Sequence, residues 1–228
     1  MSPATARTSP EGPQTELDAW ERAYLRFETP SQEQRKFTRR LRAVGAERWR
    51  RDALVLDLFS GRGGGATALR RMGFSRVLSV DLSPRLLRGR EDVSDCSVAD
   101  CRQLPIAGGS VDVAIVQGGL HHLARLPEDL SAALEEVARI LRPDGVFVAI
   151  EPWRTPFLDF VHWLCFVPLV RKLSPKLDAL ATMIDLERRT YEAWLGSARA
   201  ILEILDRHFV GRRLQIRMGK VQYVGVVR

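Results

Sequence analysis

The chain has 228 residues, 45% of them hydrophobic, which is enough for one domain with a sizeable core and added helices. Basic residues outnumber acidic ones by 35 to 28, a net charge of +7 that leaves a polyanionic partner open. The densest basic run, at 35–51, has no aromatic residues alternating with its arginines, so we interpret it as a solvated helical face and do not expect nucleic acid as the partner.

Cysteine usage and the N-terminal composition favour a cytoplasmic protein. Cys96, Cys101 and Cys165 are odd in number and lack metal-binding spacing, so we expect reduced thiols and no metal. The first residues contain no apolar core and are predicted to form a disordered leader rather than a signal peptide. The apolar stretch 157–170 is interrupted by polar residues and falls short of the ~20 residues needed to cross a bilayer, so no transmembrane segment is expected.

Hydrophobic periodicity divides the chain into successive parts. Two helices are expected near the N-terminus, at 17–27 and 31–44, the second capped by Ser31. Short runs rich in Val, Ile and Leu then alternate with helical patterns, which is typical of a parallel sheet covered on both faces. The expected parts are a leader (1–14), an N-terminal helical arm (15–50), a Rossmann-like core (51–154), a helical lid (155–210) and a C-terminal hairpin (211–228).

Within the core, strands and helices are expected to alternate regularly. The expected strands are 53–58, 76–81, 96–99, 111–117 and 146–151, and the expected helices are 64–72, 83–90 and 128–141. The last helix is followed by a turn at 142–145, where proline and glycine stop it. The hairpin is expected to contain strands 214–217 and 222–227.

A glycine loop lies between the first strand and its helix. Gly61 and Gly63 permit backbone conformations closed to other residues and a close approach of ligand to main chain, while the helix N-terminus offers free N–H donors. Asp57, inside the strand, would repel a pyrophosphate but can attract an ammonium group. Ala66 replaces the third glycine of a dinucleotide-binding loop. The loop therefore favours a ligand with an amino-acid moiety over a nicotinamide nucleotide.

Two further strands end in carboxylates. Asp81 follows the second strand and can accept both ribose hydroxyl hydrogens, although a helix-capping role is the alternative. Asp100 follows the third strand and can accept from an adenine amine, with the N–H of Cys101 facing a ring nitrogen. Acids at three successive strand ends predict a cradle for an amino acid, a sugar and a purine.

From 53 to 151 the chain resembles the ubiquinone-biosynthesis-like (methyltransferase type 11) group of class I S-adenosylmethionine-dependent methyltransferases. The resemblance lies in the glycine loop, the second and third acidic strand ends, the strand 112–117 and the turn 141–145. It implies a seven-stranded sheet in the order 3-2-1-4-5-7-6 with strand 7 antiparallel, and S-adenosylmethionine as cofactor with S-adenosylhomocysteine as product. Phe59 and Ser60 depart from the group's usual loop. The cofactor-binding residues so implied are Asp57, Phe59, Ser60, Gly61, Gly63, Asp81, Leu82, Asp100, Cys101 and Gln117.

The candidate catalytic residues follow the fourth strand. The resemblance places the transferred methyl group near His121 and His122, and either imidazole could take a proton from a hydroxyl nucleophile. Alternatively, one histidine packs the helix start while the other is exposed. Two adjacent histidines without a third ligand do not predict a metal site.

The acceptor is expected to be a small, apolar molecule. The helical lid contains many aromatic and aliphatic residues, although core packing would explain them equally. Tyr24, Glu151 and Tyr191 are candidate substrate contacts. The alternatives are an RNA methyltransferase, a non-catalytic S-adenosylmethionine-binding subunit of a partner enzyme and, more distantly, a nicotinamide-dependent reductase; the oligomeric state is open.

Overall fold

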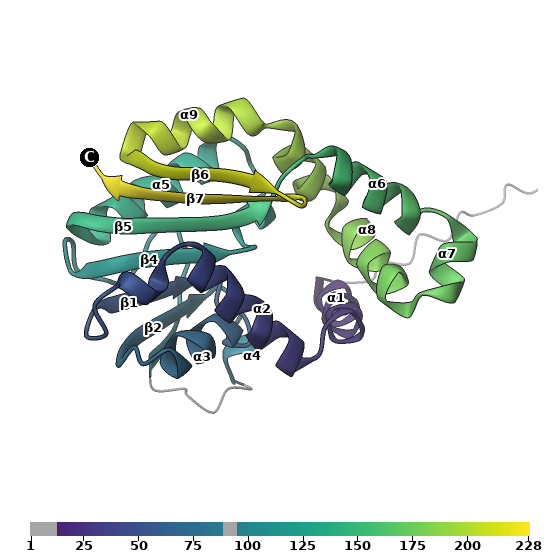
Figure 1. The fold of residues 1–228 in the computed structure, drawn as a ribbon, viewed down its shortest axis with the longest axis horizontal. Coiled ribbons are helices and arrows are strands. Elements are labelled where there is room, and N and C mark those ends of the chain that lie inside the picture. The colour runs from purple at the N-terminus through teal and green to yellow at the C-terminus, as the bar shows by residue number, and fades with distance from the viewer. Residues whose placement is uncertain (1–12, 89–94) are drawn as a thin grey trace, which may run out of the picture.

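A seven-stranded sheet forms the centre of the computed structural model, which describes residues 13–88 and 95–228 (Figure 1). Its order is β3-β2-β1-β4-β5-β7-β6. All neighbouring pairs are parallel except β5 with β7 and β6 with β7. The strands are β1 (Leu54–Leu58), β2 (Arg76–Asp81), β3 (Cys96–Val98), β4 (Val111–Gln117), β5 (Leu141–Pro152), β6 (Phe209–Arg217) and β7 (Lys220–Val227). The strand order and the antiparallel β7 that the family resemblance implied are thus confirmed.

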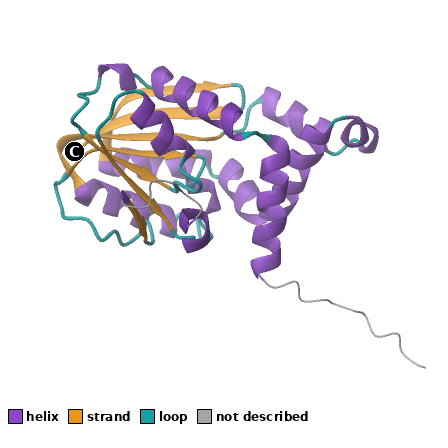
Figure 2. Cartoon of the chain, turned by 90° about the horizontal axis from the view of Figure 1, so that it is seen from below, coloured by secondary structure: helices purple, strands orange, loops and turns teal. Residues whose placement is uncertain are grey.

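Helices cover both faces of the sheet and extend beyond one end of it (Figures 1 and 2). They are α1 (Pro13–Phe27), α2 (Pro30–Ala43), α3 (Gly64–Arg71), α4 (Pro84–Arg88), α5 (Glu128–Ile140), α6 (Pro156–Cys165), α7 (Pro168–Leu173), α8 (Pro175–Gly196) and α9 (Ala198–His208), with short 3-10 turns η1 (Ala46–Arg48) and η3 (Leu120–His122). None of the helices in the described ranges is both long and apolar enough to span a membrane.

Strand alternation explains the two cores. Successive side chains of a strand point to opposite faces. Leu56 and Leu58 therefore join the core with α5 and α9, whereas Val55 joins the core with α2 and α3. Both cores consist of fully buried aliphatic and aromatic side chains, so the strand tips at the edge of the sheet are held rigidly.

The lid stands on this frame at the carboxyl edge of the parallel strands. Helices α1 and α8 pack against each other, and α6 and α7 lie beyond the carboxyl edge of the sheet, with α6 next to the β6–β7 turn (Figure 1). The Trp194 indole Nε1 donates a hydrogen bond of 2.8 Å to the Pro152 carbonyl, which fixes the C-terminal part of α8 to the tip of β5. The lid is therefore anchored to the core at a strand end.

Several expected boundaries differ from the structure. The side chain that caps α2 is Thr29 rather than Ser31, because Pro30 occupies the first helical position and Gln32 completes a capping box with Thr29. The expected turn at 142–145 lies within β5, where the register with β4 shifts and Asp144 has a φ of 62°. Strand β6 begins at Phe209, earlier than expected. The expected leader and the end of the 83–90 helix lie largely outside the described residues.

Candidate functional site

A cavity of about 1140 Å³ separates the carboxyl edge of the sheet from the lid. Its walls come from the loops after β1, β2, β3 and β4 on one side and from α1, α2 and α8 on the other. The sequence-predicted residues that line it are Tyr24, Phe59, Ser60, Gly61, Asp81, Leu82, Asp100, Cys101, Gln117, His121, His122 and Tyr191. Asp57, Gly63 and Glu151 lie outside this lining.

The glycine loop presents backbone to the cavity. Gly61 has a φ of 49°, and a Cβ built on it would meet no atom within 4 Å, so a ligand can approach the main chain there. Phe59 also has a positive φ, 54°, which is costly for an aromatic residue. Its ring occupies the place that a Cβ on Gly119 would take, at 2.2 Å from Phe59 Cγ. The loops after β1 and β4 are therefore packed together through this aromatic ring.

The three strand-end acids have different surroundings. Asp81 accepts hydrogen bonds of 2.8 Å from the N–H groups of Gly61 and Ser83, so its carboxylate is fixed at the cavity wall. Asp100 is bound by the Arg102 guanidinium, and this hydrogen bonding holds the pKa of Asp100 below its usual value. Asp57 lies beneath α3, where a Cβ on Gly65 would approach its Oδ2 to 2.6 Å. Asp57 is thus placed below the loop rather than in the cavity.

The end of β4 carries unused hydrogen-bonding capacity. Neither Oε1 nor Nε2 of Gln117 has a partner among the described residues, although both atoms are buried. Buried amide groups are normally satisfied, so such a pair of atoms beside a cavity indicates a polar ligand. Nearby, burial raises the pKa of the Cys101 thiol to about 12, which keeps it protonated at neutral pH. This side of the cavity therefore offers polar contacts to a neutral or zwitterionic ligand.

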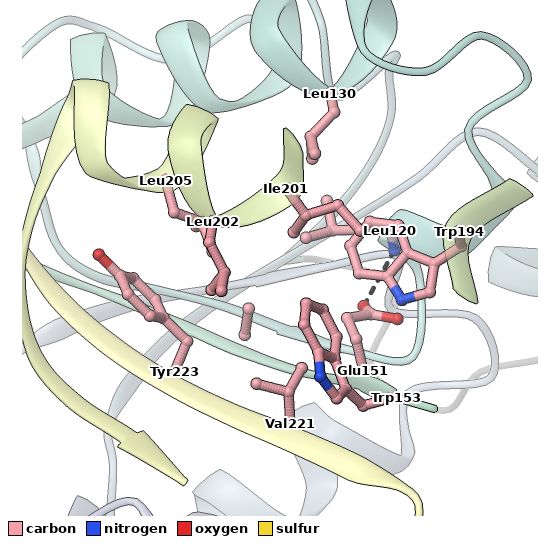
Figure 3. A pocket seen from close by; sticks show the side chains of 11 residues that line it. Leu120, Leu130, Glu151, Trp153, Trp194, Ile201, Leu202, Leu205, Val221 and Tyr223 are labelled. Atoms are coloured by element: carbon pink, nitrogen blue, oxygen red, sulfur yellow. Dashed lines mark hydrogen bonds between the residues drawn. The ribbon is translucent and has the colours of Figure 1, made fainter. Parts of the chain in front are cut away.

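Glu151, at the tip of β5, organises the loop after β4. Its side chain is fully buried, and Oε1 accepts hydrogen bonds from the Gly119 and Leu120 N–H groups at 2.8 and 3.0 Å. Oε2 lies 2.8 Å from His121 Nδ1. Figure 3 shows this carboxylate among Trp153, Trp194 and other apolar side chains. Burial raises the pKa of Glu151, but the His121 and backbone hydrogen bonds outweigh it and hold the pKa below its usual value.

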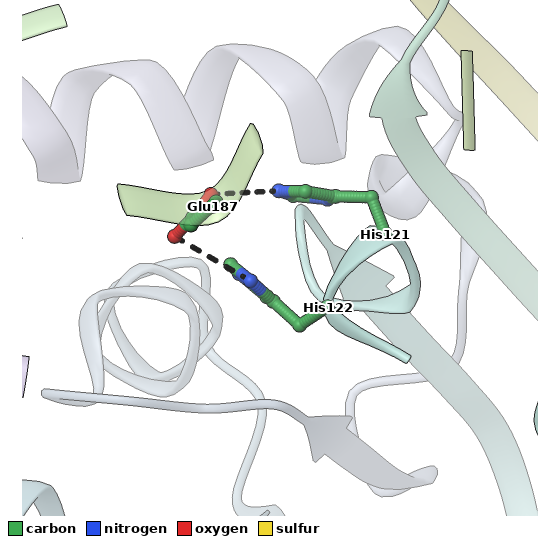
Figure 4. Close-up of side chains that lie close together, drawn as sticks. All are labelled: His121, His122 and Glu187. Carbon is green, nitrogen blue, oxygen red and sulfur yellow. Dashed lines mark ion pairs between the residues drawn. The ribbon is translucent and has the colours of Figure 1, made fainter. Parts of the chain in front are cut away.

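The two histidines and Glu187 of α8 meet at the cavity (Figure 4). His121 Nε2 lies 3.8 Å from Glu187 Oε2, and His122 Nδ1 lies 3.5 Å from Glu187 Oε1. Because Glu151 engages Nδ1 of His121, Nε2 is the ring nitrogen that faces Glu187. Desolvation and the neighbouring His121 lower the pKa of His122, although 36% of its side chain remains exposed. Of the two rings, His121 is the one that a buried carboxylate orients.

Glu187 is also a possible third metal ligand beside the two histidines, which the sequence did not indicate. Ligand atoms of all three residues lie within 4.8 Å of one another, the one such group among the residues described. Donors at ~2.1 Å from one ion would lie roughly 3.0 to 3.5 Å apart. The His122–Glu187 separation of 3.5 Å is at the upper end of that range, and the His121–Glu187 separation of 3.8 Å exceeds it. Glu187 stands four residues before Tyr191 on α8, and this helical spacing is the signal that could have revealed it.

The lid wall is mostly apolar. Phe27, Phe157, Leu180, Met183 and Ile184 line it. The Tyr24 hydroxyl donates a hydrogen bond to Glu33, and the Tyr191 hydroxyl lies 3.1 Å from His162 Nε2. Burial raises the pKa of both tyrosines, so their hydroxyls stay protonated at the cavity wall.

Six cationic side chains line the cavity, and none was among the predicted site residues: Lys36, Arg40, Arg62, Arg102, Lys176 and Lys220. Lys36 and Arg40 belong to the arginine-rich run interpreted as a solvated face, yet both line the cavity, so that interpretation is wrong for these two residues. They face inward because α2 packs against α3 beside the glycine loop. Lys220, which begins β7, lines the cavity too, and burial lowers its pKa to about 7. Its position in a hairpin gave no signal in the sequence.

Comparison with known proteins gives one matching family and several relatives. Residues 56–149 match the model of a methyltransferase domain. The chain is 30% identical over 145 residues to the ubiquinone/menaquinone biosynthesis C-methyltransferase UbiE of Rubrivivax gelatinosus, covering 59% of this chain and 55% of that protein. It is 34% identical over 98 residues to the demethylmenaquinone methyltransferase of Mycobacterium marinum, covering 42% and 40%. The chain thus spans about half the length of these curated relatives.

Solved structures share the fold over nearly the whole chain. A Pyrococcus horikoshii protein superposes with a TM-score of 0.66 at 18% identity, covering 92% of this chain and 98% of that one. A putative methyltransferase from Haloferax volcanii, solved with the Trm112 methyltransferase activator, has a TM-score of 0.61 at 19% identity, covering 93% and 96%. The fold is therefore shared with these structures over more than nine tenths of the chain.

Burial of Glu187 predicts a pH-dependent effect on stability. Desolvation, partly opposed by His121, raises the pKa of Glu187 to about 7. Between the unfolded pKa of ~4.3 and the folded value, the native state binds the extra proton, so this group lowers stability as pH rises. Glu187→Gln should therefore raise the free energy of unfolding by about 2 kcal/mol at pH 8 and by less than half of that at pH 5. Urea denaturation at both pH values measures this.

The matched control for this measurement is Glu192→Gln, an exposed acid on the same helix, which should change stability by less than ~0.5 kcal/mol at either pH. A gain for Glu187→Gln that is equal at pH 5 and pH 8 would show that charge burial is not its cause.

Proposed function

Because the chain belongs, through its methyltransferase domain, to the class I S-adenosylmethionine-dependent methyltransferases, we propose that it transfers a methyl group from this cofactor to a small, largely apolar acceptor. One observation supports this most strongly. One cavity is lined both by polar groups at the strand ends and by apolar side chains of the lid, and His121 also lines it. Two ligands of different chemistry can therefore meet there.

The residues present fit the cofactor. The orphaned amide of Gln117 and the open space over Gly61 leave room and partners for a polar ligand beside β1 and β4. Asp81 would accept hydrogen bonds from the ribose hydroxyls, with Leu82 and the Cys101 N–H beside the purine. Arg40 and Lys36 would face the cofactor's carboxylate from α2. Asp57 would act from beneath the loop, since it does not line the cavity.

The acceptor we propose is a hydroxylated aromatic ring such as a reduced quinone. The apolar lid wall supports this, and the named relatives act in quinone biosynthesis. The cofactor supplies a methyl group on a sulfonium sulfur, which the acceptor nucleophile displaces in line. The protein's contribution is to align the acceptor beneath α8 and to take its proton.

His121 is the proposed proton acceptor. Glu151 fixes its ring through Nδ1, which directs Nε2 toward the cavity and stabilises the imidazolium that forms. Glu187, across the cavity from Nε2, would stabilise the same charge. His122 would shape the wall beside Trp20, whose ring it meets edge-on. Tyr24 and Tyr191 would position the acceptor through their protonated hydroxyls.

Cofactor binding is tested by isothermal titration with S-adenosylhomocysteine. Asp81→Asn should weaken binding at least about tenfold, because charge-assisted hydrogen bonds to the ribose are lost. Glu203→Gln, an exposed acid on α9, should leave the affinity unchanged. The cofactor assignment fails if the wild-type protein does not bind S-adenosylhomocysteine, or if both variants bind it equally well.

The role of His121 is tested by turnover on reduced naphthoquinones that lack a ring methyl group. His121→Gln should lower kcat by about 100-fold or more, whereas His122→Gln should lower it less than about tenfold. Both variants should keep wild-type affinity for S-adenosylhomocysteine. Equal losses in the two variants, or a larger loss in His122→Gln, would contradict the assignment of the base.

A further inference from the structure

Helices α6 and α7 carry a row of large apolar side chains that no part of the described chain covers. Phe160, Trp163, Leu169 and Leu173 are 54%, 61%, 65% and 75% exposed, and Phe166 between them is 45% exposed. The rings of Phe160 and Trp163 stack on each other, with centroids 5.9 Å apart, rather than on the core. We call these five residues the α6–α7 apolar surface. Exposed apolar residues gathered in this way mark an interaction site.

The orientation of these residues is set by the helices themselves. Thr155 caps α6 by accepting a hydrogen bond of 3.1 Å from the Leu158 N–H, and Pro156 occupies its first position. Cys165 is the buried residue of α6, so that side of the helix faces the protein interior. The aromatic residues of α6 face outward. In α7 no residue is buried. The exposure is therefore a property of well-formed helices, not of an irregular segment.

Basic residues surround the α6–α7 apolar surface. Within 154–176 the chain has four basic residues, of which Arg154 lies 3.7 Å from Asp159 and Arg171 lies 2.8 Å from Asp178 of α8, so that Lys172 and Lys176 carry the uncompensated charge. Lys172 is exposed and makes no hydrogen bond or ion pair within the described chain, and Lys176 is exposed beside Phe27. Aromatic and aliphatic side chains flanked by lysine and arginine are the composition that binds the headgroup region of anionic bilayers.

We propose that the α6–α7 apolar surface docks on an anionic lipid bilayer, inserting Phe160, Trp163, Leu169 and Leu173 into the headgroup region while Lys172 and Lys176 contact lipid phosphates. The protein would lie on the surface of the membrane, with its apolar side chains in the headgroup region. In Figure 1, α6 and α7 lie beyond the carboxyl edge of the parallel strands, outside the layers of the sheet.

The α6–α7 apolar surface continues into the cavity, so docking on a bilayer would bring the cavity close to the lipid. Phe157, one turn before Phe160 on α6, is 43% exposed and also lines the cavity, and Lys176 does the same from the start of α8. The lid wall between them is apolar. An acceptor dissolved in the bilayer could pass along Phe157 into the cavity without crossing water; this part of the inference rests on the proposed function, whereas the docking itself does not.

A lipid surface fits these observations better than a second copy of the chain. The flanking cations would repel the same cations of a symmetry-related copy, because an isologous interface brings identical patches together. Lipid phosphates instead supply the opposite charge, and long basic side chains can reach them while apolar neighbours insert.

The test is co-sedimentation of the full chain with vesicles of phosphatidylcholine alone or with about 30% phosphatidylglycerol. Anionic lipid should strengthen partitioning at least about tenfold, and raised salt should weaken it. The double variant Phe160→Ser with Trp163→Ser should lose at least about tenfold in partitioning. The matched control is Leu214→Ser with Ile216→Ser on β6, at 49% and 45% exposed, which should partition as wild type.

Charge is tested in parallel. Lys172→Ala with Lys176→Ala should remove most of the preference for anionic vesicles, whereas Arg35→Ala with Arg39→Ala, exposed arginines of α2, should retain it. Trp163 fluorescence should shift to shorter wavelength on binding, and this shift should be absent in Trp163→Phe.

The proposal is overturned if the wild-type chain does not bind anionic vesicles, or if the β6 control loses as much binding as the α6 variant. It is also overturned if the wild type is a dimer that Phe160→Ser with Trp163→Ser converts to a monomer without any vesicle binding, since the surface would then join two copies. Binding of S-adenosylhomocysteine, measured on the same samples, is expected to be unchanged throughout. If the proposed function is wrong, the loss would appear in the binding of S-adenosylhomocysteine and not in the vesicle assay.

Discussion

The architecture of the site depends on one buried carboxylate. Glu151 has no exposed surface, and its two oxygens accept hydrogen bonds from two backbone N–H groups and meet an imidazole. An ionised carboxylate in an apolar interior is stable only when it is satisfied in this way. Because these partners all lie in the loop after β4, the charge holds that loop in one conformation. The position of His121 follows from this constraint.

From this point the structure extends in two directions. Toward the sheet, Gly119 receives the Phe59 ring, which ties the glycine loop after β1 to the loop after β4. Toward the lid, Trp194 bonds the carbonyl of Pro152, next to Glu151, and Glu187 faces His121. Both the cofactor side and the acceptor side of the cavity are therefore held in place by contacts that lead to the tip of β5. Methyl transfer depends on the alignment of two ligands, so the proposed reaction requires that one element of the fold fix the positions of both ligand sites.

The positions of the strands could be predicted from the sequence because their determinants are local, whereas the strand order followed from the family resemblance. Short Val- and Leu-rich runs ending in Asp81 and Asp100 mark strand tips that must meet at one edge of a parallel sheet. What the sequence could not predict depends on tertiary packing. Asp57 proved to lie beneath α3, because its place within β1 says nothing about which side of the loop it faces. Arg40 and Lys36 face the cavity because α2 packs on α3, and helix-face polarity alone suggested solvent. Glu187 meets the histidines only through the fold of α8.

Amide hydrogen exchange at Gly119 and Leu120 tests the central claim most directly, by comparing the wild-type protein with Glu151→Gln. The account predicts that both amides are protected in the wild type and that the variant loses at least about tenfold of that protection, while amides in the middle of β1 remain protected. If Gly119 and Leu120 exchange equally slowly in both proteins, the charge of Glu151 does not hold the loop, and the placement of His121 would need another cause.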